Sequence, residues 1–312
     1  MAQPFSHIPF YRQMIALLRN ALNMLDEQGR KEVLQFLLSQ QNRDGGFQDR
    51  GGRSDLYYSL FGGLMGRAWS MEQRAEGLES EDRRPKLEKP LPEREAVEGS
   101  NQYGTVLKLK QFIAWQSNSE VPGFIEKCCL VLLQKELKTD RISRIWSFFS
   151  LGKSFWKERH SINLSYRSFV LFLTLDAVLP IRGFLRMASK RMLAKTMIDG
   201  NSPCSEVAAR LFLKKMMNQD GSKEQELLMS CACKSGGFKA FAHLDNADML
   251  STAVALFALD FAGSDLRLLK PACLDFIQSN YSEGAFLSGD GDQIADVEYT
   301  FYGLLALGVL EK

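Results

Sequence analysis

The sequence has little of what marks secreted, membrane-spanning or β-sheet proteins. Its six cysteines follow no spacing that suggests a disulfide framework, so reduced and mostly buried thiols are expected. The first residues lack the charged flank, apolar run and small-residue cleavage site of a signal peptide. The most apolar window, residues 169–179, contains an aspartate and is too short to cross a bilayer. With β-strand patterns also almost absent, we expect a cytoplasmic and mainly helical protein.

The charge balance excludes a general attraction to nucleic acid, because the net charge is only +2. The charges are unevenly spread, however. Segment 135–195 holds 13 Lys and Arg against 4 Asp and Glu, with Trp and Phe between them. It is a candidate for holding a diphosphate at a cavity rim or for peripheral contact with a membrane, although solvated helix faces would give the same pattern. Segment 70–100 is rich in charge and proline, and we expect it to be a mobile insertion.

Three segments share one pattern, in which a helical stretch ends at a Gly-Gly-Phe or Gly-Ala-Phe hinge. They are LLSQQNRDGGF ending at Phe47, LMSCACKSGGF ending at Phe238 and FIQSNYSEGAF ending at Phe286. Eight to ten residues after each hinge, an aspartate opens a second helical stretch. These aspartates are Asp55, Asp248 and Asp296. Two of the stretches nearly coincide, since DLYYSLFGGL at the first hinge matches DVEYTFYGLL at the last.

The repeat has a physical explanation. A glycine can adopt the left-handed conformation that ends a helix, and an aspartate can accept the unpaired N–H groups of the next helix. The stretches after the aspartates are apolar on nearly every side, which predicts inner helices, whereas those before the hinges are amphipathic and suit an outer layer. Weaker copies predict inner helices at 161–175 and 201–216, and outer helices at 123–137 and 181–197. We therefore predict an all-α fold, in which five to seven hairpins of a single domain, residues 1–312, form a closed double ring.

Helical hairpins joined by Gly-Gly-Phe turns resemble the α/α toroid shared by protein prenyltransferase β subunits and terpenoid (squalene-type) cyclases. The resemblance is strongest over 230–312, extends to 30–66 and is thin between 100 and 230. DVEYTFYGLLAL is close to the Asp-x-x-His-Thr-x-(Tyr/Phe)-Gly-Leu-x-x-Leu segment of the geranylgeranyl-transferring β subunits. The resemblance implies an apolar central cavity and an isoprenoid or similar lipid-like substrate.

The residues that carry the chemistry of that family are mostly replaced here. Aligned by the hinge, the Asp, Cys and His that bind zinc in the prenyltransferases fall on Asp248, Leu250 and Tyr299. The basic residues that hold the prenyl diphosphate fall on Phe241 and Leu244. The acidic motif of the cyclases keeps only its first carboxylate. No metal site is predicted, and the cofactor is left open.

Two other groups have the side chains of metal sites. Cys231 and Cys233, with His243 and Asp245, include zinc ligand types, but the cysteines precede a hinge, and a structural role is favoured. The Asp-Gly-Asp sequence at 290–292 lacks the later glutamate of a calcium loop and reads as a turn.

Two functions remain open. If the protein is an enzyme, Asp248 is the expected acid, and Asp245 would be the second carboxyl that raises its pKa. If it is not an enzyme, we expect the toroid to bind a lipid-like ligand or a partner protein, such as a partner subunit, without catalysis. Residues expected to contact the substrate are Lys239, His243, Tyr299, Phe257 and Tyr302.

Overall fold

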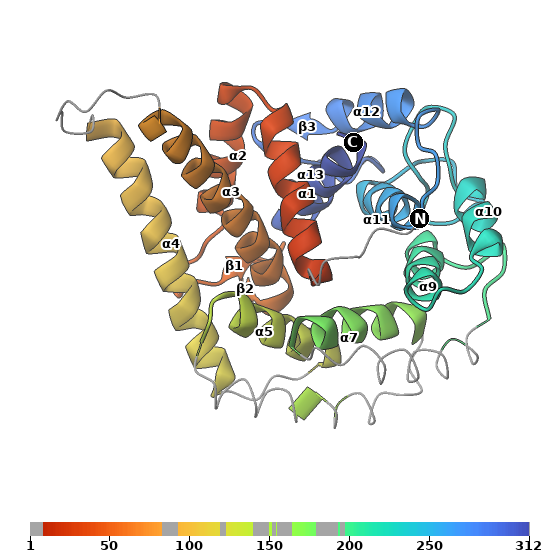
Figure 1. Ribbon diagram of the computed structural model, residues 1–312, viewed down its shortest axis with the longest axis horizontal. Helices are drawn as coiled ribbons and strands as arrows, with labels where there is room; N and C mark the ends of the chain where they lie inside the picture. The colour runs from red at the N-terminus through yellow and green to blue at the C-terminus, as the bar shows by residue number, and fades with distance from the viewer. Residues whose placement is uncertain are drawn as a thin grey trace.

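The computed structural model describes residues 9–82, 93–118, 123–139, 150–151, 154, 164–178, 193 and 197–311 (Figure 1), with backbone alone at 73–82, 93–103 and 164. Its helices are α1 (Phe10–Met24), α2 (Glu27–Ser39), α3 (Leu56–Asp82), α4 (Glu93–Ser117), α5 (Phe124–Glu136), α7 (Leu164–Val178), α9 (Cys204–Met216), α10 (Ser222–Ser230), α11 (Met249–Phe261), α12 (Lys270–Ser279) and α13 (Val297–Leu310). Strands β1 (Phe47–Gln48) and β2 (Ser54–Asp55) form one antiparallel pair, and β3 (Tyr281–Ser282) and β4 (Ala285–Phe286) form another.

The helices form the two layers of an α/α toroid. In the inner layer α3, α5, α7, α9, α11 and α13 contact one another in that order, and α13 contacts α3, so the ring closes. Helices α4, α10 and α12 pack on the outside of inner helices and lie at the edges of the molecule in Figure 1. The predicted fold class is confirmed.

The prediction of an outer helix at 123–137 is wrong, because α5 belongs to the inner ring. It contacts α3 and α7, and Ile125, Cys129 and Leu132 face the centre. The charged residues at its two ends give the sequence an amphipathic look, although residues 128–134 are all buried. The inner helices predicted at 161–175 and 201–216 are present as α7 and α9. The outer helix predicted at 181–197 lies almost entirely outside the described residues.

Each hinge glycine packs against the backbone of the next outer helix. Gly45, Gly236 and Gly284 have φ angles of +94°, +100° and +85°, which disfavour any residue with a side chain. A Cβ atom on them would lie 2.0, 1.9 and 2.2 Å from a carbonyl oxygen of α4, α12 and α2, respectively. The contact of Gly284 with Glu32 of α2 joins the last repeat to the first, so the glycines also fix the ring geometry.

The repeated motif after each hinge holds the hinge phenylalanine in place. A hydroxyl four residues after each capping aspartate accepts the backbone N–H of that phenylalanine, and all three hydroxyl residues are fully buried. Gly303 makes room for the last of these rings, because a Cβ there would lie 2.3 Å from Phe286. The three hydrogen bonds join Phe47 to Ser59 at 2.9 Å, Phe238 to Thr252 at 2.8 Å and Phe286 to Thr300 at 3.3 Å.

Helix α1 covers the end of the ring where the inner helices finish. Phe10 packs its ring against Phe172, Phe212 and Phe261, at centroid distances of 5.9, 5.0 and 5.4 Å. The approach of α1 to α13 is close enough that a Cβ on Gly308 would lie 1.9 Å from a carbonyl oxygen of α1. None of the helices expected from the sequence covers this segment.

The charged segment 70–100 differs from the expected loop in its described parts. Helix α3 continues through Asp82, and α4 begins at Glu93, so both ends of the segment are helical. Residues 83–92 lie outside the described residues. The mobility of the segment stays a prediction.

Candidate functional site

An apolar cavity of about 340 Å³ lies at the centre of the inner ring. Every inner helix described contributes to its wall, and Tyr11 and Met14 of α1 contribute to its floor. The volume is at the small end of the range found for pockets that bind drug-sized molecules. The aromatic side chains of the wall are Tyr57, Phe61, Tyr166, Phe169, Phe212, Phe257, Phe301 and Tyr302.

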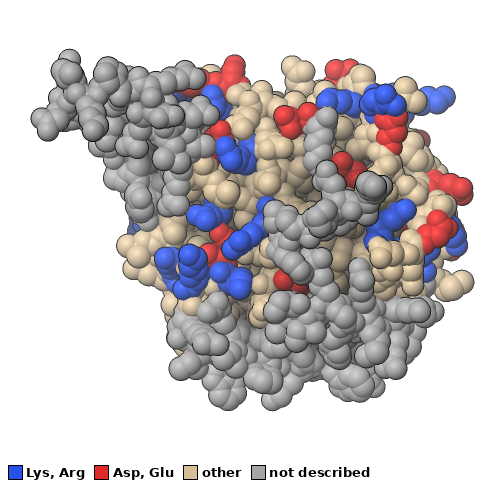
Figure 2. All heavy atoms as spheres, in the orientation of Figure 1, with Lys and Arg blue, Asp and Glu red and all other residues tan. Residues whose placement is uncertain are grey.

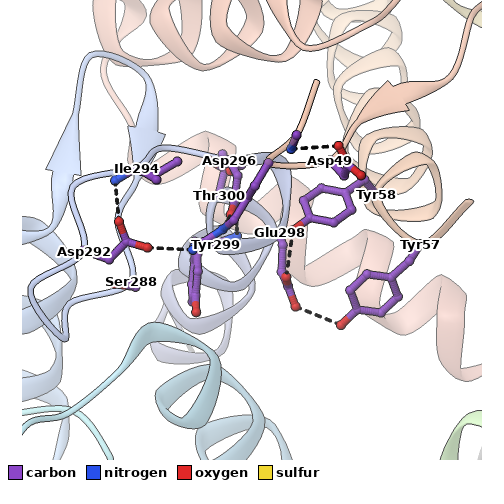
Figure 3. Close-up of polar contacts among 12 residues, drawn as sticks. Asp49, Tyr57, Tyr58, Ser288, Asp292, Ile294, Asp296, Glu298, Tyr299 and Thr300 are labelled. Atoms are coloured by element: carbon purple, nitrogen blue, oxygen red, sulfur yellow. Dashed lines mark hydrogen bonds and ion pairs between the residues drawn. The ribbon is translucent and has the colours of Figure 1, made fainter. Parts of the chain in front are cut away.

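A hydrogen-bonded network of tyrosines around a half-buried glutamate adjoins one part of this wall (Figure 3). Tyr57 and Tyr58 of α3 donate to the two carboxylate oxygens of Glu298 on α13, at 2.9 and 3.4 Å. The hydroxyl of Tyr302 lies 3.4 Å from that of Tyr57, so a second phenol joins the network from α13. The network crosses the junction where the ring closes.

Burial sets the protonation chemistry of this network. It raises the pKa of Glu298, while the hydrogen bond from Tyr57 opposes that shift by favouring the carboxylate. Burial also raises the pKa of Tyr57 and Tyr302 well above the ordinary phenol value. The tyrosines are therefore neutral hydroxyls throughout the physiological range.

A second, shallower pocket of about 600 Å³ adjoins the cavity at the start of the inner helices. Ser205 and Leu250 line both spaces, so the two adjoin there, and this second pocket is called the mouth. Asp245, Asp248 and Asp290 also line it, and they make this mouth acidic.

Asp248 and Asp296 cap adjacent helices but differ in their second oxygen. In each, Oδ1 accepts a first-turn N–H, from Ser251 or Tyr299, at 2.8 Å. Oδ2 of Asp296 accepts from Arg50 at 2.7 Å, whereas Oδ2 of Asp248 is buried and has no hydrogen-bond partner among the described residues. Burial raises the pKa of Asp248 and, after the opposing hydrogen bonds, the nearby charge of Asp290 raises it further.

The predicted site residues fall into three places. Asp245 and Asp248 lie at the mouth with Tyr299, while Phe257 and Tyr302 line the cavity. Lys239 is occupied by the carbonyl of Ala242, which accepts from its ammonium group at 2.8 Å, and His243 is exposed on the loop that follows. The neighbouring carboxylate that raises the pKa of Asp248 is Asp290 rather than the expected Asp245. The catalytic and binding roles of these residues stay predictions.

The residues at the mouth do not fit the zinc site of the prenyltransferases. Leu250 offers no donor atom, and the ring of Tyr299 lies under the guanidinium of Arg50, 5.1 Å from its centroid. No group of three or more His, Cys, Asp or Glu side chains in the described part of the chain is arranged to hold a metal ion. Phe241 and Leu244, at the positions of the family's diphosphate-binding residues, line the mouth with apolar surface.

Sequence reasoning missed Tyr57, Tyr58 and Glu298. The signal was present, because Tyr57 and Glu298 occupy the same place in the repeated motif, two residues after Asp55 and Asp296. Their contact depends on the first and last inner helices becoming neighbours, which follows only from closure of the ring.

The face shown in Figure 2 presents no continuous basic area over the described residues. On the side shown in Figure 2, Lys and Arg are interspersed with Asp and Glu over the described residues. Most of the basic segment 135–195 lies outside those residues. Among the helices described, none combines the length and apolarity needed to cross a membrane. Five of the six cysteines are buried, as expected.

The comparison with protein families agrees with this architecture. The family model of the prenyltransferase alpha-alpha toroid domain matches residues 6–151 and 206–312. No protein with a curated description matches the chain. The family match covers most of the sequence and spans all three hinge repeats. The chain therefore belongs to the prenyltransferase α/α toroid family.

Proposed function

We propose that the protein binds an isoprenoid or a similar lipid-like molecule in its central cavity. The observation that carries this proposal is the apolar cavity itself, walled by the inner helices and floored by α1. Removing an apolar chain from water gives roughly 0.8 kcal/mol for each buried CH₂ group, so a tail enclosed by this wall would supply most of the affinity.

The replaced residues favour binding over prenyl transfer by the family's zinc chemistry. Leu250 and Tyr299 stand where a thiolate and an imidazole would be needed to bind the metal. A cyclase-like reaction is the second candidate, since burial raises the pKa of Asp248 at the mouth and so favours its protonated, acidic form. The expected cytoplasmic location, a partner subunit and peripheral membrane contact through 135–195 remain predictions.

Native mass spectrometry with added farnesol or geranylgeraniol tests the proposal. The protein should retain one isoprenoid, and Val254→Trp should abolish retention because Val254 lines the cavity. Leu268→Trp is the matched control, since Leu268 is 94% exposed and lies away from the cavity. Loss of binding in both variants, or in neither, would contradict the assignment of the cavity.

The same samples separate binding from catalysis. They are incubated with farnesyl diphosphate, with and without magnesium or zinc, and the products are separated by chromatography. Turnover that Asp248→Asn removes would establish an enzyme, whereas retained lipid without product would establish a binding protein. If the protein shows neither bound lipid nor product, the proposal is refuted.

A further inference from the structure

The direction of the hydrogen bonds in the tyrosine network decides which polar groups a ligand can offer to the cavity wall. An ionised Glu298 can only accept hydrogen bonds. The single hydroxyl proton of Tyr57 is donated to this carboxylate at 2.9 Å. The contact between Tyr57 and Tyr302 at 3.4 Å must then be donated by Tyr302. The hydroxyl protons of Tyr57 and Tyr302 are then both directed towards Glu298. Tyr302 lines the cavity, and its hydroxyl oxygen keeps its lone pairs as acceptors for a ligand.

The mouth likewise favours a ligand that donates hydrogen bonds or carries positive charge. The described residues that line the cavity and its mouth include the carboxylates Glu206, Asp245, Asp248 and Asp290, and none of these lining residues is Lys, Arg or His. Of the cations beside the mouth, Arg50 already pairs with Asp292 and Asp296 at 2.6 and 2.7 Å. A phosphate entering here would lose its hydration and meet like charge.

Helix N-termini often bind phosphate, but in four of the described inner helices, α3, α9, α11 and α13, first-turn N–H groups already have acceptors. First-turn N–H groups of α3, α11 and α13 donate to their own aspartate caps. At the start of α9, the N–H groups of Cys204 and Glu206 donate to the carbonyls of Ala240 and Pro203. These amides are therefore taken before a ligand arrives.

We infer that the ligand carries a hydrogen-bond donor, either a hydroxyl or a protonated amine, that meets the tyrosine network, and that such a ligand binds more tightly than a prenyl diphosphate. This inference rests on the proposed binding of an isoprenoid in the cavity. It narrows the expected ligand class from isoprenoid or similar lipid-like molecules to isoprenoid alcohols or amines.

Three ligands with the same tail test it, because the contribution of the tail then cancels. Farnesol, farnesylamine and farnesyl diphosphate are titrated into the protein at neutral pH by isothermal titration calorimetry, below the concentration at which each ligand aggregates. Farnesol and farnesylamine should each bind at least tenfold more tightly than the diphosphate. A diphosphate that binds as tightly as either of them would overturn the inference while leaving the cavity assignment intact. Failure of all three ligands to bind would instead overturn the proposed function, and the inference with it.

Variants of the network identify the source of the preference. Tyr302→Phe removes one cavity-facing acceptor and should weaken farnesol binding roughly 2- to 12-fold. Glu298→Gln removes the charge and supplies an amide donor to Tyr57, so the preference for the amine over the diphosphate should narrow by about tenfold or more. Asp265→Asn is the control for charge, since Asp265 forms an exposed ion pair with Arg267. An unchanged preference in Glu298→Gln, or an equal change in Asp265→Asn, would show that the network does not set it.

Discussion

The closure of the ring can be tested at Gly284, where the last repeat meets α2. Replacement by alanine places a Cβ 2.2 Å from the carbonyl oxygen of Glu32 and forces a side chain into a backbone with φ of +85°. The left-handed conformation costs about 1–2 kcal/mol for a residue with a Cβ, and overpacking adds about 1–3 kcal/mol. We therefore expect Gly284→Ala to lower the free energy of unfolding by about 2–5 kcal/mol.

Gly263→Ala separates the two contributions. Gly263 has a similar φ of +77°, but a Cβ there would meet nothing within 4 Å. This variant should show the backbone cost alone, about 1–2 kcal/mol. Both variants are compared with the unchanged protein by urea denaturation followed by circular dichroism, provided that the unfolding is reversible. If Gly284→Ala loses no more stability than Gly263→Ala, close contact between the first and last repeats is not needed, and our account of ring closure fails.

Two further predictions concern the caps and hinges. Burial raises the pKa of Asp248 in the folded state, so its carboxyl adds stability at low pH that is lost as the pH rises through that pKa. Asp248→Asn keeps the N-cap but removes the charge. Asp248→Asn should therefore unfold at a higher temperature than the unchanged protein at pH 7 but not at pH 4. Asp248→Ala should lower the free energy of unfolding by about 1 kcal/mol, because it removes the N-cap. A lower melting temperature for Asp248→Asn at pH 7 would contradict this prediction. Thr300→Val should cost about 1–3 kcal/mol in urea denaturation because the buried N–H of Phe286 loses its acceptor, and Thr300→Ser should restore most of it. Equal losses in the two Thr300 variants would count against this hydrogen bond.

The parts of the fold that follow from local chemistry were predictable. Short stretches of sequence were enough to predict the hinge glycines, the capping aspartates and the inner position of α11 and α13, which are apolar on nearly every side. Charged ends concealed the inner position of α5, because its burial depends on neighbours distant in sequence.

The candidate site was harder to predict because ring closure builds it. Tyr57 and Glu298 are 241 positions apart in the chain, and no local pattern joins them. The floor of the cavity was missed for the same reason, because α1 is positioned by contacts with helices that are distant in the sequence. The positions Leu250 and Tyr299, by contrast, were readable directly, because the resemblance supplied the residues that should have stood there.

The joint between the ends of the chain also bears on how the protein is made. Helix α13 supplies Glu298 and part of the cavity wall, and its residues are translated after all the other inner helices. Until they leave the ribosome, the nascent chain holds greasy helices with no neighbour on one side, a state prone to aggregation. The inner ring can therefore close only after α13 has been synthesised, because α13 supplies the contacts with both α11 and α3.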